Sequence, residues 1–127
     1  MEGTALDYWK KSQENFTVSQ NARDSGHLNA AASRYYYALV LAGLALFAWK
    51  KIPIIWERHP LFIEELSDLL DSEGCASCDV VYDALWGAFD TRARADYEPY
   101  PVKPRHLDAV VSKCATTLNA IKTALKC

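Results

Sequence analysis

The sequence predicts an all-α fold, an up-and-down helical bundle of four long helices and one short helix. Apolar residues recur with the 3.6-residue period of amphipathic helices, and no stretch reads as a strand. Gly, Pro and Asp-Ser clusters divide the chain into five such segments. Residues 35–49 contain no charged side chain, which predicts a helix buried at the centre. With 127 residues, half of them apolar, the chain is expected to form a single domain spanning 1–127.

The first helix is expected over residues 4–24. Its apolar side is expected to carry Leu6, Trp9 and Phe16. Gly26 follows in a turn, because glycine readily adopts the positive φ that ends many helices.

The central helix is expected over residues 27–50. Ala38, Ala42 and Ala45 share one smooth side of it, which lets a neighbouring helix approach closely. Pro53 is expected to break this helix, since proline has no N–H and restricts the residue before it.

The second half of the chain predicts a short helix from about Pro60, a fourth helix over 79–97 and a fifth over 105–126. One side of the fourth helix carries Val81, Ala84, Leu85, Ala88, Arg92, Ala95 and Asp96. Asp90 and Arg94 form an i,i+4 pair on the opposite, solvent side. The fifth helix buries Leu107, Val110, Val111, Cys114, Leu118, Ile121 and Leu125.

Composition narrows the functional classes. A net charge of −2 and a pI near 5.9 argue against a general basic surface for duplex nucleic acid. The longest apolar run is shorter than the about 20 residues of a membrane span, so we expect no membrane association. The N-terminus shows no basic region followed by an apolar run, and this predicts a cytoplasmic protein with reduced thiols.

Cys75 and Cys78 form a single C-x-x-C motif. A structural zinc site usually needs four ligands, often as two such pairs, and no second pair is present. We therefore expect no metal and no other cofactor. A redox pair remains an alternative, although the βαβ context of such motifs is missing.

Two stretches together indicate a family. Residues 32–38 read A-S-R-Y-Y-Y-A, and residues 92–97 read R-A-R-A-D-Y. They resemble the S-R-x-Y-Y-A and R-x-x-A-D-Y patterns of the HEPN domain family. The order of features is also similar across essentially the whole chain: an Asn-Ala-Ala lead, a His in the middle loop (His59) and a final helix.

The resemblance implies a small helical bundle that is often dimeric. Such domains are commonly encoded beside a minimal nucleotidyltransferase, as a toxin–antitoxin-like pair. It also implies binding of RNA or a nucleotide, and the matching positions here are Arg34, Tyr37, Arg92, Asp96 and Tyr97.

Many members of that family are metal-independent RNases that use an Arg followed a few residues later by a His. Here Tyr97 stands where that His is expected after Arg92. Histidine titrates near neutral pH whereas tyrosine has a pKa near 10, so the substitution argues against general acid–base catalysis.

Three functions are compatible with the sequence. The first is a binding or regulatory module for RNA, a nucleotide or a nucleotidyltransferase partner. The second is a divergent metal-independent RNase toxin that uses Arg92 and Tyr97 as its catalytic candidates. The third is a helical bundle with only a structural or assembly role.

Two structural hypotheses accompany these functions. Arg34 and Asp96 are both charges on otherwise apolar helix faces, so they are expected to pair across two packed helices. A homodimer is expected because the central helix is apolar all round and a domain of this size is expected to leave part of it uncovered.

Overall fold

A computed structural model describes residues 3–75 and 78–125 of the chain. Within these residues it contains five α-helices and no strand, which confirms the all-α prediction. The helices are α1 (Gly3–Asp24), α2 (Leu28–Trp49), α3 (His59–Ser72), α4 (Cys78–Tyr97) and α5 (Pro104–Leu125). Each predicted boundary lies close to the observed one, and Pro60 lies in the first turn of α3 as expected.

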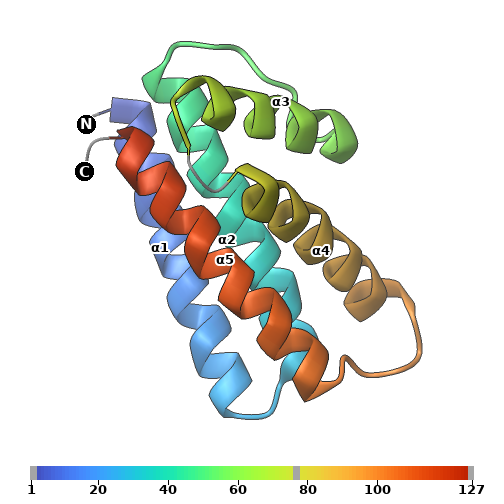
Figure 1. The fold of residues 1–127 in the computed structure, drawn as a ribbon. Coiled ribbons are helices and arrows are strands. Elements are labelled where there is room, and N and C mark those ends of the chain that lie inside the picture. Colours follow the sequence, from blue (N-terminus) through green and yellow to red (C-terminus); the bar gives the residue numbers. More distant parts are fainter. Residues whose placement is uncertain (1–2, 76–77, 126–127) are drawn as a thin grey trace.

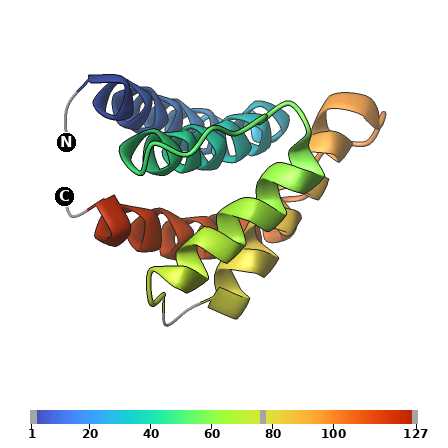
Figure 2. The same ribbon diagram turned by 90° about the horizontal axis from the view of Figure 1, so that it is seen from above.

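The helices form two layers around α2. The hairpin of α1 and α2 makes one layer, and the antiparallel pair of α4 and α5 packs on its other side (Figures 1 and 2). The short helix α3 lies across the end of this arrangement and packs mainly against α4. The first turn of α1 and the last turn of α5 lie at the same end of the bundle (Figure 1).

The contact between α1 and α2 uses small residues. The fully buried residues of α1 are Ala5, Ser12 and Ser19, seven residues apart. The Ser12 hydroxyl donates to the carbonyl oxygen of Ala38 at 2.6 Å, so the two backbones are close. The predicted apolar stripe of α1 is confirmed in part, because Trp9 and Phe16 pack against the core. Its large residues Leu6, Trp9 and Phe16 are only half-buried and flank the small-residue contact.

Helix α2 is the centre of the bundle, and 13 of its 22 residues are buried. Its three predicted small residues, Ala38, Ala42 and Ala45, are completely buried. The helix ends before Pro53, because Lys51 adopts φ 58° and Ile52 donates its N–H to the carbonyl of Phe47 at 2.9 Å. This left-handed residue, rather than the proline, closes the helix.

By length and composition α2 is also the one described helix that could cross a membrane. However, 72% of its most apolar window is buried inside the bundle, and the core helix of a folded domain passes the same test.

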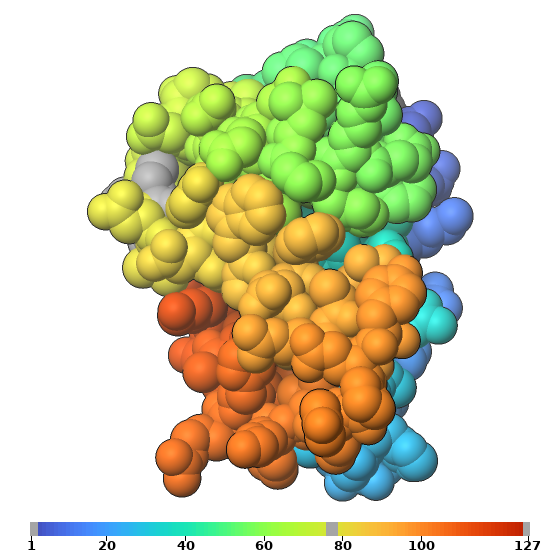
Figure 3. All heavy atoms as spheres, turned by 90° about the vertical axis from the view of Figure 1, so that its right-hand side faces the viewer, coloured from blue at the N-terminus to red at the C-terminus, as the bar shows by residue number. Residues whose placement is uncertain are grey.

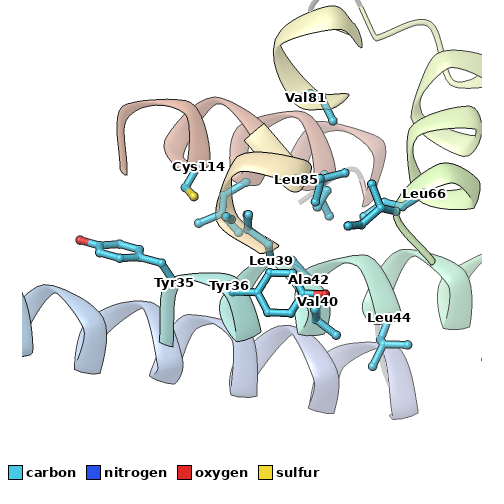
Figure 4. Packing of buried hydrophobic residues seen from close by; sticks show 14 of the residues in the cluster. Tyr35, Tyr36, Leu39, Val40, Ala42, Leu44, Leu66, Val81, Leu85 and Cys114 are labelled. Atoms are coloured by element: carbon cyan, nitrogen blue, oxygen red, sulfur yellow. The ribbon is translucent and has the colours of Figure 1, made fainter. Parts of the chain in front are cut away.

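The core forms where α3, α4 and α5 meet α2. Leu66, Leu85 and Cys114 come from these three helices and point toward the interior that α2 lines (Figure 4). Cys114 is completely buried, as its phase on the last helix predicted, and burial raises the pKa of its thiol to about 12.

The side chains of Phe62 and Leu66 on α3 reach α2 at Gly43. A Cβ atom at Gly43 would lie 2.7 Å from Leu66 Cδ2 and 2.8 Å from Phe62 Cζ, and both of those side chains are completely buried. Only glycine leaves room for this approach. The position of α3, and with it the first residue of α3, therefore depends on the missing side chain at position 43.

The connection between α4 and α5 is anchored to the start of α2. The backbone N–H of Val102 donates to the side-chain oxygen of Asn29 at 2.9 Å, and Val102 is buried. Asn29 is the first residue of the Asn-Ala-Ala lead, so this part of the sequence pattern has a structural role.

The Cys75–Cys78 motif falls partly outside the described residues, because positions 76 and 77 and the side chain of Cys78 are not described. Over the described ranges no group of three or more His, Cys, Asp and Glu side chains comes together in a way that could hold a metal ion.

Candidate functional site

The three consecutive tyrosines of α2 differ in burial. Tyr35 and Tyr36 are buried, whereas Tyr37 is half-buried at the surface. Arg92 lies on the side of α4 that faces α2, and its side chain is only 13% exposed. Nη2 of Arg92 donates a hydrogen bond to the Tyr37 hydroxyl at 3.1 Å, which joins two residues 55 positions apart.

Aromatic rings surround the Arg92 guanidinium. Its central carbon lies 5.7 Å from the ring centroid of Tyr36, 5.5 Å from that of Tyr37 and 5.9 Å from that of Tyr97. These separations are within the range in which a cation is attracted to the face of a ring. Tyr97 is 78% exposed, so one wall of this enclosure is open to solvent.

Asp96 supplies a negative charge one helical turn after Arg92. Its Oδ2 lies 3.1 Å from Nε of Arg92, and the carboxylate is 32% exposed. The Nε atom nevertheless has no aligned acceptor, so this contact is electrostatic and leaves a buried donor unsatisfied. Burial alone lowers the pKa of Arg92, but the hydrogen bond to Tyr37 and the charge of Asp96 raise it overall. The guanidinium therefore stays charged.

His59, the first residue of α3, completes the group. Its Nδ1 atom lies 2.5 Å from the Tyr36 hydroxyl, and the two rings are 5.4 Å apart. Burial and the positive charge of Arg92 lower the pKa of His59 below its ordinary value, against an opposing effect of Glu57. Burial also strongly raises the pKa of Tyr36. At neutral pH both groups are therefore uncharged.

We call this group the Arg92 cluster. It consists of Tyr36, Tyr37, His59, Arg92, Asp96 and Tyr97. Four of the five predicted binding residues belong to it. The cluster combines a fixed cation, a neighbouring carboxylate, an uncharged imidazole and three phenol groups at a partly open edge of the bundle. The cation and the phenol hydroxyls are groups that can bind a phosphate, whereas Asp96 would compete with it.

Arg34 lies elsewhere, and the predicted ion pair between Arg34 and Asp96 was wrong. Arg34 is exposed and donates to the side-chain oxygen of Asn15 on α1 at 3.1 Å. Asp96 is instead next to Arg92 on its own helix. The two residues lie on different sides of the α2 axis, because Arg34 is on the side of α2 that borders α1, whereas α4 packs on another side.

A groove lies next to the Arg92 cluster. It has a volume of about 360 Å³, and Arg34 and Tyr37 of α2 line it together with Tyr8 of α1 and Trp56 of the α2–α3 connection. Tyr37 belongs to both features, because its ring lines the groove while its hydroxyl accepts from Arg92. In Figure 3 a strip of α2 is visible between α1, the α2–α3 segment and the end of α4.

Sequence reasoning noted His59 only as a loop residue, and it missed Trp56 and Phe89, whose rings lie 5.9 and 5.6 Å from the His59 ring. Trp56 lies in the connection just before this histidine, whereas Phe89 comes from α4 and has no signal near His59 in the sequence. Comparison of the sequence with protein-family models and with curated proteins gives no match. The site must therefore be interpreted from its own chemistry.

Proposed function

We propose that this chain is a HEPN-like binding module that recognises RNA through a phosphate contact at Arg92. The supporting observation is a permanently charged guanidinium that donates one hydrogen bond, to the Tyr37 hydroxyl, and lies beside the exposed ring of Tyr97. Arginine presents five N–H donors, and the two contacts described above leave several of them free. A phosphate oxygen is the natural acceptor for such a group.

The surrounding rings support the same assignment. Tyrosine hydroxyls donate to phosphate, and exposed tyrosine faces stack on unpaired bases, so Tyr97 is suited to contact a single strand next to Arg92. The resemblance of residues 32–38 and 92–97 to the HEPN patterns also supports this function. That resemblance depends on the sequence alone and is independent of the contacts described above.

Arg94 provides a matched control for the test. Arg92 and Arg94 lie on the same helix, and each forms an i,i+4 pair with an aspartate, Arg94 with Asp90 at 3.4 Å. Arg92→Ala and Arg94→Ala therefore remove the same charge and the same kind of pair. Fluorescence anisotropy with a labelled single-stranded RNA should show a loss of about tenfold or more for Arg92→Ala, because hydrogen bonds to charged groups contribute about 1.5–3 kcal/mol. Arg94→Ala should change affinity by less than about threefold.

Thermal unfolding by circular dichroism accompanies both variants, because Arg92 also contacts the core. Equal RNA affinity for the two alanine variants, with both folded, would remove the proposal. Arg92→Lys separates charge from geometry: it keeps the charge but loses the planar fork, so a phosphate clamp should remain weakened.

Asp96→Asn distinguishes a ligand role from a structural one. The carboxylate next to Arg92 competes with an anionic ligand for the guanidinium. Removing its charge should strengthen RNA binding if Arg92 holds phosphate. If Arg92 serves only the fold, the same change should lower stability and leave RNA affinity unaltered.

A second candidate function is metal-independent RNA cleavage, and one observation favours it. The Arg92 cluster contains His59, whose pKa is lowered by burial and by Arg92, so the imidazole is uncharged and able to accept a proton at neutral pH. Among the cluster residues this makes His59 better suited than the phenol of Tyr97 as a general base. Cation and base would then come from different helices.

The cleavage test uses purified protein, labelled RNA and excess chelator. Activity that disappears in both Arg92→Ala and His59→Asn but persists in Tyr97→Phe would establish this second function. Activity that needs Tyr97 would instead support the divergent RNase predicted from the motif. No cleavage by the folded protein, combined with Arg92-dependent binding, would leave the binding module alone.

The remaining expectations are part of the same proposal. They are a cytoplasmic protein, a homodimer and a minimal nucleotidyltransferase partner. Helix α2 is largely covered within one copy of the chain, so it offers no broad apolar face to a second copy. Exposed apolar side chains lie instead at Trp49, Ile52, Ile55 and Leu61, around the end of α2 and the start of α3. Analytical ultracentrifugation at micromolar concentration tests this expectation.

A further inference from the structure

The groove beside the Arg92 cluster combines three aromatic side chains from three different elements. Tyr8 comes from α1, Tyr37 from α2 and Trp56 from the α2–α3 connection, while Leu41 and Leu44 add an aliphatic surface along α2. The volume of about 360 Å³ is within the range of roughly 300–1,000 Å³ typical of small-ligand sites. A flat, apolar group with two faces suits this lining.

The charges of the groove are of one sign. Among the described residues that line it, Arg34 is charged and none is an aspartate or glutamate. Arg34 donates one hydrogen bond, to Asn15, and the side chain is otherwise exposed, so most of its N–H donors are available. Arg92 does not line the groove, but it donates a hydrogen bond to the hydroxyl of Tyr37, which does. The order is therefore cation, aromatic surface, cation.

That order matches the chemistry of unpaired nucleotides. Sites for single-stranded nucleic acid combine aromatic rings, on which bases stack, with positive groups that follow the backbone. We propose that the groove is a stacking subsite for one base of single-stranded RNA, with the phosphate of that nucleotide on Arg92 and the neighbouring phosphate attracted by Arg34. This inference rests on the phosphate role of Arg92 proposed above and adds what lies beside it.

Three ligands distinguish the contribution of the base to binding affinity from that of the phosphate backbone. They are a labelled adenosine pentanucleotide, an abasic strand with the same number of phosphates, and free adenosine monophosphate as a competitor. We expect the pentanucleotide to bind at least about fivefold more tightly than the abasic strand, because stacking of one base on an aromatic side chain contributes that much or more. Competition by the free nucleotide as strong as by RNA would identify a mononucleotide as the ligand of the same subsite.

A bulky side chain that fills the groove tests whether the base binds there. Leu41→Trp adds a ring to a half-buried position in the groove, whereas Val18→Trp adds the same ring to an exposed position of α1 outside it. Leu41→Trp should reduce binding of the pentanucleotide to the level of the abasic strand, with abasic binding unchanged, and Val18→Trp should change neither. Tyr8→Ala, which removes an aromatic wall, provides a second route to the same loss.

The outcomes distinguish the two proposals. Equal affinity for the pentanucleotide and the abasic strand, or no effect of Leu41→Trp and Tyr8→Ala, overturns the stacking subsite while Arg92-dependent binding still stands. If Arg92→Ala changes neither ligand, both proposals fail. If Leu41→Trp changes the sedimentation coefficient and not RNA affinity, the groove is a contact between copies of the chain, and the stacking subsite is likewise overturned.

Discussion

Gly43 of α2 lies against the side chains of Phe62 and Leu66 of α3, and replacing it with alanine measures how tightly these side chains pack. The added Cβ would lie 2.7 Å from Leu66 Cδ2 and 2.8 Å from Phe62 Cζ. Both distances are well below van der Waals contact. Because Phe62 and Leu66 are completely buried, neither side chain can move aside into solvent.

Two terms of opposite sign determine the magnitude. Forcing an extra methyl group into a well-packed core costs typically about 1–3 kcal/mol. Alanine is favoured over glycine inside a helix by about 1 kcal/mol. Two simultaneous clashes place the packing cost in the upper part of its range, so Gly43→Ala should destabilise the protein by about 1–2 kcal/mol net. For a chain of this size that corresponds to a decrease in melting temperature of about 4–8 °C.

Gly87→Ala is the control, because Gly87 also lies within a helix but a Cβ there meets nothing within 4 Å. Only the propensity term applies to it, so it should stabilise the protein by up to about 1 kcal/mol. Urea unfolding followed by circular dichroism measures both. If Gly43→Ala is as stable as Gly87→Ala, α3 does not approach α2 as closely as described, and the position of His59 loses its explanation.

Three further predictions concern single groups. Ser12→Ala should cost about 1 kcal/mol of unfolding free energy in urea titrations, because it removes the buried hydrogen bond to the Ala38 carbonyl. The pKa of His59 is lower in the folded protein than in the unfolded chain, so on acidification the unfolded chain takes up the proton first. The free energy of unfolding should therefore be at its full value above about pH 6.5 and decrease below it. His59→Asn should remove this pH dependence. Cys114, with a thiol pKa raised to about 12, should resist iodoacetamide at pH 8 in the folded protein and react in urea, as read by peptide mass mapping.

The helices could be predicted from the sequence because each has a strong period or strong end signals. Pro60 and Gly26 mark boundaries by backbone chemistry alone, and both lie where expected. The buried side of α1 could not be predicted in the same way. Hydrophobicity patterns give weight to large residues, whereas this contact depends on Ser12 and Ser19, whose hydroxyls are satisfied by backbone carbonyls.

The site was predictable only within single helices. Arg92 and Asp96 are one turn apart, so their contact follows from helix geometry, and the motif pointed to Tyr37. The failed Arg34–Asp96 pair and the unforeseen Tyr36–His59 contact both depend on how separate helices are rotated against each other. That rotation is set by packing details such as the absent side chain of Gly43, which no local pattern encodes.

The small-residue contact of α1 with α2 supports one part of the proposed site and not the other. Helix α1 packs chiefly on α2, with the Arg23–Asp108 ion pair reaching α5. No residue of the Arg92 cluster comes from α1, but one wall of the groove does. A change that displaces α1 would therefore alter that wall of the groove without removing any residue of the Arg92 cluster.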